Sequence, residues 1–108
     1  MTPLETLKAA RQLISDPAKW TQGKGARMFN LKPVFARDPA AVCWCSMGAI
    51  YKQCTDQDRS TSDFAFSVLD KKCWNLHGIS AVNFNDTHTH AEVLALFDAA
   101  IAELEVLA

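Results

Sequence analysis

The sequence lacks a long apolar run and an excess of charge of either sign. No stretch of about 18 or more apolar residues occurs, so we expect no helix that spans a membrane. The segment from Met1 to Glu5 contains an acid and no apolar core of a signal peptide, which favours a cytoplasmic protein. The 11 Lys and Arg residues are offset by 12 Asp and Glu residues, whereas phosphate recognition needs a basic surface. We therefore expect neither a membrane nor a nucleic acid as the partner.

The common short motifs of catalysis and metal binding are missing as well. No Gly-rich phosphate loop occurs, since Gly23-Lys24-Gly25 is too short and has no preceding strand. No Cys-x-x-Cys pair of the kind that zinc ribbons use is formed by the 4 cysteines, which are Cys43, Cys45, Cys54 and Cys73. Without an export signal these thiols are predicted to be free and buried. The sequence therefore predicts no cofactor.

The composition that remains is that of an ordinary globular domain. The chain has 108 residues, of which 49% are hydrophobic and 21% charged, so we expect one domain over residues 1–108 with a modest core. Helical periodicity dominates, and the predicted fold is mainly α, a compact four-helix domain with a small irregular or β-hairpin insertion. The insertion is expected at residues 25–35, with Asn30 in the turn of the hairpin.

The first predicted helix begins at Thr2 and ends before Pro17. Thr2 and Glu5 match a capping box. One apolar face is formed at helical spacing by Leu4, Leu7, Ala10 and Ile14. Arg11 lies at the edge of this face, where it either extends its head group to solvent or pairs with a buried carboxylate such as Asp86.

The second predicted helix is the most apolar segment of the chain. Asp38 is expected to cap it and Pro39 to open it. From Ala40 to Tyr51 the residues are apolar on all sides, which is typical of a helix that other helices surround. Cys45 would then lie well inside this helix, where the helix dipole has little effect on its thiol.

The other two predicted helices are separated by an extended segment. The third begins near Ser60, and Gly78 can close it. Residues 79–86 alternate weakly and are expected to be extended. The last helix begins at Thr89, which forms a capping box with Glu92. The apolar face of this helix is wider than one small core can cover, so a homodimer is a possible partner arrangement.

Cys45 is the candidate nucleophile of the sequence. A cysteine that follows Trp at a helix start is typical of papain-like cysteine amidases and peptidases, and Trp44-Cys45 resembles that arrangement locally. Such a thiol needs a histidine, and His88 or His90 is the candidate, with Asp86 or Asn85 to orient it. The alternative is a buried thiol of the core, which the predicted position inside a helix and the missing sheet favour.

The polar run from Asn85 to His90 is the second candidate site. It can serve as turn and cap, because Asn, Asp and Thr hydrogen-bond to nearby backbone. It can also form a polar surface in which Asp86 acts as acid or base. His88 and His90 could bind a metal if this segment were extended, since residues two apart then share a face.

The three tryptophans Trp20, Trp44 and Trp74 are either core residues or part of a binding surface. Core filling is the simpler interpretation of three large side chains in a short chain. An exposed tryptophan beside Arg27 or Arg37 would instead indicate a binding surface.

The motifs also form one ordered pattern. It runs through Ala10-Arg11-x-Leu13-Ile14, Trp20-Thr21-x-Gly23, Trp44-Cys45-x-x-Gly48-Ala49 and Asn85-Asp86 before Val93. This pattern resembles an uncharacterised bacterial and phage family that is classed as a domain of unknown function. The resemblance covers nearly the whole chain and implies a small helical cytoplasmic domain, with no known activity or catalytic residue. It also implies that seven residues lie together in space: Trp20, Gly23, Trp44, Cys45, Gly48, Asn85 and Asp86.

The sequence favours a non-enzymatic binding or regulatory module, because no complete catalytic set is evident. The partner would be a protein or a small molecule, bound near the segment from Asn85 to His90. The predicted binding residues are Trp20, Trp44, Asn85, Asp86 and His88. Two alternatives stay open, a small cysteine hydrolase that uses Cys45 with His88 or His90, and a metal-binding module.

Overall fold

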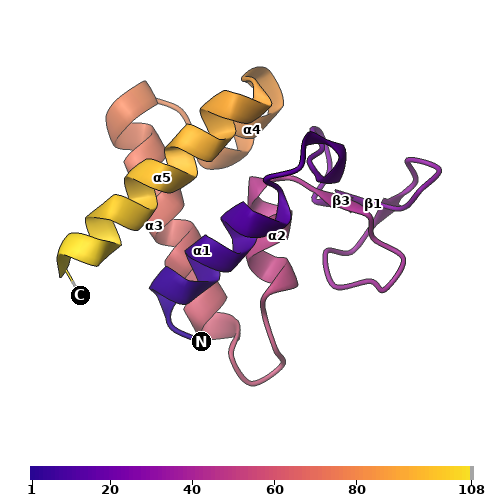
Figure 1. Ribbon diagram of the computed structural model, residues 1–108, viewed down its shortest axis with the longest axis horizontal. Helices are drawn as coiled ribbons and strands as arrows, with labels where there is room; N and C mark the ends of the chain where they lie inside the picture. Colours follow the sequence, from indigo (N-terminus) through magenta and orange to yellow (C-terminus); the bar gives the residue numbers. More distant parts are fainter. Residues whose placement is uncertain (108) are drawn as a thin grey trace.

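A computed structural model describes residues 1–107 as five α-helices, one 3-10 turn and three short strands (Figure 1). In chain order these are α1 (Pro3–Leu13), η1 (Pro17–Lys19), β1 (Ala26–Arg27), β2 (Pro33–Val34), β3 (Cys43–Trp44), α2 (Ser46–Lys52), α3 (Arg59–His77), α4 (Ala81–Thr87) and α5 (His90–Leu107). The fold is mainly helical and compact, as predicted, but it has one helix more than the four expected. Within residues 1–107 no helix is long and apolar enough to cross a lipid bilayer.

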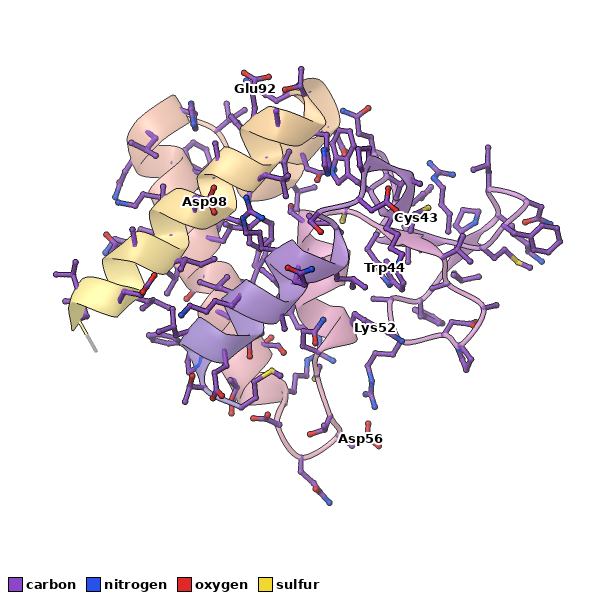
Figure 2. The ribbon with its side chains drawn as sticks, viewed as in Figure 1. Cys43, Trp44, Lys52, Asp56, Glu92 and Asp98 are labelled. Atoms are coloured by element: carbon purple, nitrogen blue, oxygen red, sulfur yellow. The ribbon has the colours of Figure 1, made fainter. Side chains whose placement is uncertain are left out.

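Helix α1 occupies the centre of the helical part, where it packs against α2, α3 and α5. Its predicted apolar face is buried, and Leu7, Ala10 and Ile14 are fully inaccessible to solvent. Arg11 lies beside this face and donates to Asp98 of α5, with Nε 2.6 Å from Oδ1 and Nη2 3.2 Å from Oδ2. Figure 2 labels Asp98 on α5. The predicted partner Asp86 is therefore wrong, because α5 brings a nearer carboxylate to the guanidinium.

Two predicted capping boxes and one helix end are confirmed. Glu5 N donates to Thr2 Oγ1 at 3.1 Å and Thr2 N to Glu5 Oε1 at 2.8 Å. The same exchange joins Thr89 and Glu92 at the start of α5. Gly78 ends α3 with φ +70°, a conformation that glycine adopts at little steric cost. Local side-chain chemistry fixes these ends, so the sequence alone could predict them.

The predicted central helix from Pro39 to Tyr51 is wrong in its first half. Asp38 Oδ1 accepts from Ala40 N at 2.8 Å, but the turn that it caps does not continue into a helix. The chain runs into β3, and α2 begins only at Ser46, with Cys45 as its N-cap. The cause is pairing with β1, since Val42 N donates to the carbonyl of Arg27 at 2.9 Å. A partner strand thus decides the structure of a segment whose apolar residues suit either element.

The predicted hairpin at residues 25–35 is present and belongs to a three-stranded antiparallel sheet of order β2-β1-β3. Asn30 lies in its turn, where Oδ1 accepts from Lys32 N at 3.0 Å. Leu31 beside it has φ +69°, a left-handed conformation that costs a side chain of this kind about 1 kcal/mol. We call residues 24–37 the hairpin arm. The arm projects away from the helices, at the right of Figure 1.

Residues 79–86, which we expected to be extended, mostly form the short helix α4. Ser80 Oγ accepts from Asn83 N at 3.2 Å, and Asp70 Oδ1 accepts from Ala81 N at 2.8 Å. The buried residues of α4 are Ala81, Phe84 and Asn85, which share one helical face. Helix α3 begins at Arg59, one residue before the predicted start at Ser60, and its N-cap Asp58 makes no side-chain bond to the backbone.

Candidate functional site

The side chain of Asn85 joins three separate parts of the chain. Its Oδ1 accepts from Trp20 Nε1 at 2.8 Å and from Ser46 N, at the start of α2, at 3.0 Å. Its Nδ2 donates to the carbonyl of Thr21 at 3.0 Å and to Asp86 Oδ1 at 3.3 Å. The residue is 1% exposed, so these bonds replace the water that its amide loses on burial.

Asp86 extends this network to a glycine turn. Gly23 has φ +84°, and its N–H donates to Asp86 Oδ1 at 2.8 Å. Gln22 Nε2 donates to the carbonyls of Asn85 and His88 at 2.9 and 3.1 Å. Residues 20–23 are thereby bound along the C-terminal end of α4. The expected turn at Asn85-Asp86 is thus the last part of a helix that another segment covers.

The segment from Trp44 to Gly48 closes the network on its other side. Thr21 N donates to the carbonyl of Trp44, and Cys45 N donates to the carbonyl of Gly25, both at 3.0 Å. A Cβ atom on Gly48 would lie only 1.9 Å from that carbonyl oxygen of Gly25, so no larger residue fits here without a shift of backbone. The structure therefore brings together the seven residues of the sequence pattern, and we call them the hub: Trp20, Gly23, Trp44, Cys45, Gly48, Asn85 and Asp86.

The thiol of Cys45 is enclosed in the hub. The residue is 5% exposed, and its Sγ accepts from Gly48 N at 3.3 Å. The predicted position inside a helix is wrong, because Cys45 is the N-cap of α2. Burial nevertheless raises the pKa of this thiol above its ordinary value, and the nearby charge of Asp86 acts in the same direction. A protonated and buried thiol is a poor nucleophile at neutral pH.

Both candidate histidines are occupied by other contacts. The ring of His88 stacks on Phe84 with 3.8 Å between centroids, and its Nδ1 lies 2.9 Å from Thr87 Oγ1. His90 Nε2 lies 2.6 Å from the carbonyl of Ile14, and because a carbonyl only accepts, this nitrogen carries the proton. Among the hydrogen bonds within residues 1–107, none joins either imidazole to Cys45.

The alternative of a metal centre finds no set of ligands. Within the part of the chain that the structure describes, no three His, Cys, Asp or Glu side chains come close enough together to hold an ion. His88 follows the end of α4 and His90 begins α5, and their rings take different partners, since His88 Nδ1 lies beside Thr87 and His90 Nε2 beside the carbonyl of Ile14. The four thiols are free, and no two of them form a disulfide.

A cleft of about 500 Å³ lies between the hairpin arm and α2, and the contact between Gly25 and Gly48 forms part of its wall. It is lined by Gly25, Val34, Phe35, Ala36, Arg37, Met47, Gly48, Tyr51, Cys54 and Arg59. Next to it is a smaller hollow of about 380 Å³, which shares Val34 and Phe35 with the cleft. The ring of Phe35 is 88% exposed, so a large apolar group stands in solvent where the two meet.

Two arginines give the cleft its positive charge. Arg37 Nη1 donates to Asp56 Oδ1 at 2.9 Å, and this contact raises the pKa of Arg37. The guanidinium of Arg59 lies over the ring of Tyr51, 5.6 Å from its centroid. Tyr51 in turn donates its hydroxyl to Asp63. Burial, together with this carboxylate, raises the pKa of Tyr51 to about 12, so the phenol is neutral and remains a donor.

The three tryptophans differ in burial, since Trp74 on α3 is 53% exposed and Trp20 is half-buried, whereas Trp44 is buried. Trp44 is 6% exposed, and its Nε1 donates to the carbonyl of Ala36 at 2.9 Å. Lys52 covers its ring, with Nζ 5.8 Å from the centroid. Figure 2 shows Trp44 beside Lys52, and Asp56 on the loop that follows α2. Trp44 therefore supports the wall of the arm from within and is no exposed binding residue.

A family model matches residues 1–103 of the chain, and the family is described as one of unknown function, DUF6197. The chain belongs to this family. Searches among curated proteins and among solved structures found no match. The match confirms the expected membership of a family of unknown function, and it assigns no activity to the hub or to the cleft of this DUF6197 domain.

The arm of the DUF6197 domain exposes apolar side chains that sequence reasoning did not select. Phe29 is 80% exposed, Leu31 66% and Phe35 88%, and Val42 on the neighbouring loop is 45% exposed. No motif marks these residues, because exposed aromatics on a hairpin have no characteristic spacing. A signal for two of them is present in the sequence, since Phe29 and Leu31 flank Asn30 in the predicted turn, where core packing cannot use apolar side chains.

Proposed function

We propose that this protein is a non-enzymatic binding module and that its ligand site is the cleft between the hairpin arm and α2. The observation that carries this proposal is the combination of a cavity of about 500 Å³ with apolar walls and two guanidinium groups at its edge. Ligand sites are usually concave and mostly apolar, with a few polar groups that fix orientation. The site thus lies on the arm side of the hub and away from the segment between Asn85 and His90.

The hub gives this cleft a rigid floor. Gly25 and Gly48 line the cleft, and the backbone of Gly25 lies directly against Gly48 of the hub. Because Cys45 N also donates to Gly25, the base of the arm and the start of α2 are held together before any ligand arrives. A preformed site loses less entropy on binding than one that must first assemble. In this proposal the hub residues other than Gly48 act as positioning residues, because they do not line the cleft.

The two alternatives receive less support. A hydrolase would need a thiolate, but burial favours the protonated thiol of Cys45, and each candidate imidazole is bound to another group. A metal-binding module would need three converging ligands, which residues 1–107 do not supply. The four free thiols support a reducing compartment, and a bacterial or phage-infected cytoplasm is the setting we propose.

The proposal is tested by adding neutral aromatic fragments, such as indole and phenol, to the 15N-labelled protein. We expect amide shifts at Gly25, Val34 and Gly48 that saturate with fragment concentration. The variant Phe35→Ser removes one exposed wall of the cleft and should weaken these shifts. Phe64→Ser is the matched control, because Phe64 is 54% exposed on α3 and does not line the cleft. Shifts centred elsewhere, or none at all, would contradict the proposal.

A further inference from the structure

Charge is strongly segregated along this chain. Residues 17–37, which lead into and form the hairpin arm, contain five Lys or Arg residues and no Asp or Glu. After Lys72 the chain contains five Asp or Glu residues and no Lys or Arg. A net charge near zero therefore conceals a positive arm, which attracts a negatively charged partner.

The acidic half of a second copy is a poor candidate for that partner. Asp98, Glu103 and Glu105 form ion pairs with α1 or α3 of their own chain. Asp86 accepts from Gly23, and Glu92 caps α5. Each of these carboxylates thus has a partner in its own chain, the weakest being the pair of Glu105 with Lys8 at 3.9 Å, and a partner protein whose carboxylates are free fits better.

The guanidinium groups of the cleft retain donors for such carboxylates. Arg37 uses one N–H on Asp56, whose side chain is 91% exposed, and an exposed ion pair of this kind contributes little. Arg59 is 3.9 Å from Asp63, which already accepts from Tyr51. Since a guanidinium carries five N–H donors, both arginines can bind a further carboxylate.

The apolar surface continues beyond the cleft. Val34 and Phe35 line both the cleft and the adjacent hollow, which also includes Pro33 and Asp38. Two neighbouring depressions with a shared apolar wall suit successive side chains of an extended peptide. A lipid surface fits less well, because a bilayer cannot fill a concave cleft whose charged groups lie at its edge.

Building on the proposed function, we infer that the occupant of the cleft is an acidic segment of a partner protein. An apolar side chain of this segment enters between Val34 and Met47, and its flanking carboxylates pair with Arg37 and Arg59. Phe35 covers the entering side chain from solvent. Recognition thus combines apolar burial with charge-assisted hydrogen bonds, which are stronger than those between neutral groups.

The test measures fluorescence anisotropy of a labelled peptide of about ten residues in which Glu alternates with Leu and Phe. We expect saturable binding that weakens as salt is added. Arg37→Ala and Arg59→Ala should each weaken binding about tenfold, the loss expected for one charge-assisted hydrogen bond. Asp56→Asn should tighten binding, because Asp56 competes for Arg37. Lys71→Ala is the control: it removes an exposed charge of α3 about 18 Å along the helix axis from Arg59 and should change nothing.

Other outcomes would overturn the inference. These are a matching peptide with Lys in place of Glu that binds equally well, tighter binding of oligothymidylate, retention by phosphatidylserine vesicles, or no binding of the acidic peptide. An equal loss of peptide affinity in Lys71→Ala would mean that the arginine variants act through net charge and not through contact with the peptide. If indole and phenol still shift the amides of the cleft while the acidic peptide fails to bind, the occupant is wrong and the proposed binding function stands. If neither binds, both proposals fail.

Discussion

The hub and the cleft share Gly48 but differ in almost every physical respect. In the hub, Asn85 is buried, and both ends of its amide are used by groups of the same chain. In the cleft, Phe35 stands in solvent and Arg37 keeps free donors. The recognisable motif residues therefore build the scaffold, whereas the residues of the proposed binding site form no motif.

Asn85→Ala should have the largest effect on stability among changes in the hub and the cleft. The change leaves Trp20 Nε1, Ser46 N and the carbonyl of Thr21 without partners, and each unpaired buried group costs about 1–3 kcal/mol. We expect a loss of about 4 kcal/mol in the free energy of unfolding, or roughly a thousandfold in the equilibrium constant. Urea denaturation followed by circular dichroism measures it.

The control for this change is Asn83→Ala on the same helix. Asn83 is exposed, and the hydrogen bonds that it makes involve its backbone only. Its replacement should alter stability by less than about 0.5 kcal/mol. If the two variants were equally stable, the hub would not hold the fold together, and its side chains would become candidates for ligand contact again.

The thiols give the second comparison, between Cys45 in the hub and Cys54 at the cleft. Cys45 is 5% exposed and burial raises its pKa, whereas Cys54 is half-buried at the cleft wall. At about pH 8 we expect iodoacetamide to modify Cys54 roughly a hundredfold faster than Cys45, since only the thiolate reacts. Mass spectrometry measures the rate of modification at each thiol of the native protein, and the two rates should become similar in denaturant.

Cys54→Ser is the matched variant for this experiment. It leaves Cys43, Cys45 and Cys73, which are all buried, so the native protein should stay unlabelled. Rapid modification of Cys45 in this variant would mean that its thiol is ionised and accessible. This result would support the hydrolase alternative, and the interpretation of the hub as a closed scaffold would be wrong.

Gly48→Ala should have an intermediate effect. Its Cβ would lie 1.9 Å from the carbonyl oxygen of Gly25, so the two backbones must separate. Overpacking of this kind costs about 1–3 kcal/mol, and we expect a loss of about 2 kcal/mol, or roughly thirtyfold in the unfolding equilibrium. Gly25→Ala tests the same contact from the other side, where a Cβ meets no atom within 4 Å, and it should be nearly neutral.

Local chemistry decided what the sequence could predict. The capping boxes at Thr2 and Thr89 depend on residues three apart, and the hairpin turn depends on Asn30 and its neighbours. The strand at Cys43–Trp44 depends on β1, some 17 residues earlier, and an apolar run carries no sign of that pairing. The ordered pattern identified the hub because its residues must fit one another, as the contact between Gly48 and Gly25 requires.

The cleft could not be predicted from the sequence, because only tertiary structure brings its residues together. Phe35 and Arg37 are separated by one residue but are distant in sequence from Met47 and Arg59, and no spacing rule connects the two pairs. Their meeting follows from the pairing of β1 with β3, which places residues 34–37 at the same cleft as α2. Only exposure identifies such residues, and exposure is a property of the folded chain.

The smallest effect on stability is expected from Phe35→Ser. The ring is 88% exposed, so little apolar area is lost from the folded state and the free energy of unfolding should change by less than about 0.5 kcal/mol. Phe84→Ala is the comparison, because Phe84 is 1% exposed and its loss should cost about 3–5 kcal/mol in the same urea titration. A loss above about 1 kcal/mol in Phe35→Ser would mean that the ring stabilises the arm itself. Its exposure would then no longer argue for a ligand, because the fold alone would account for an aromatic residue at this position.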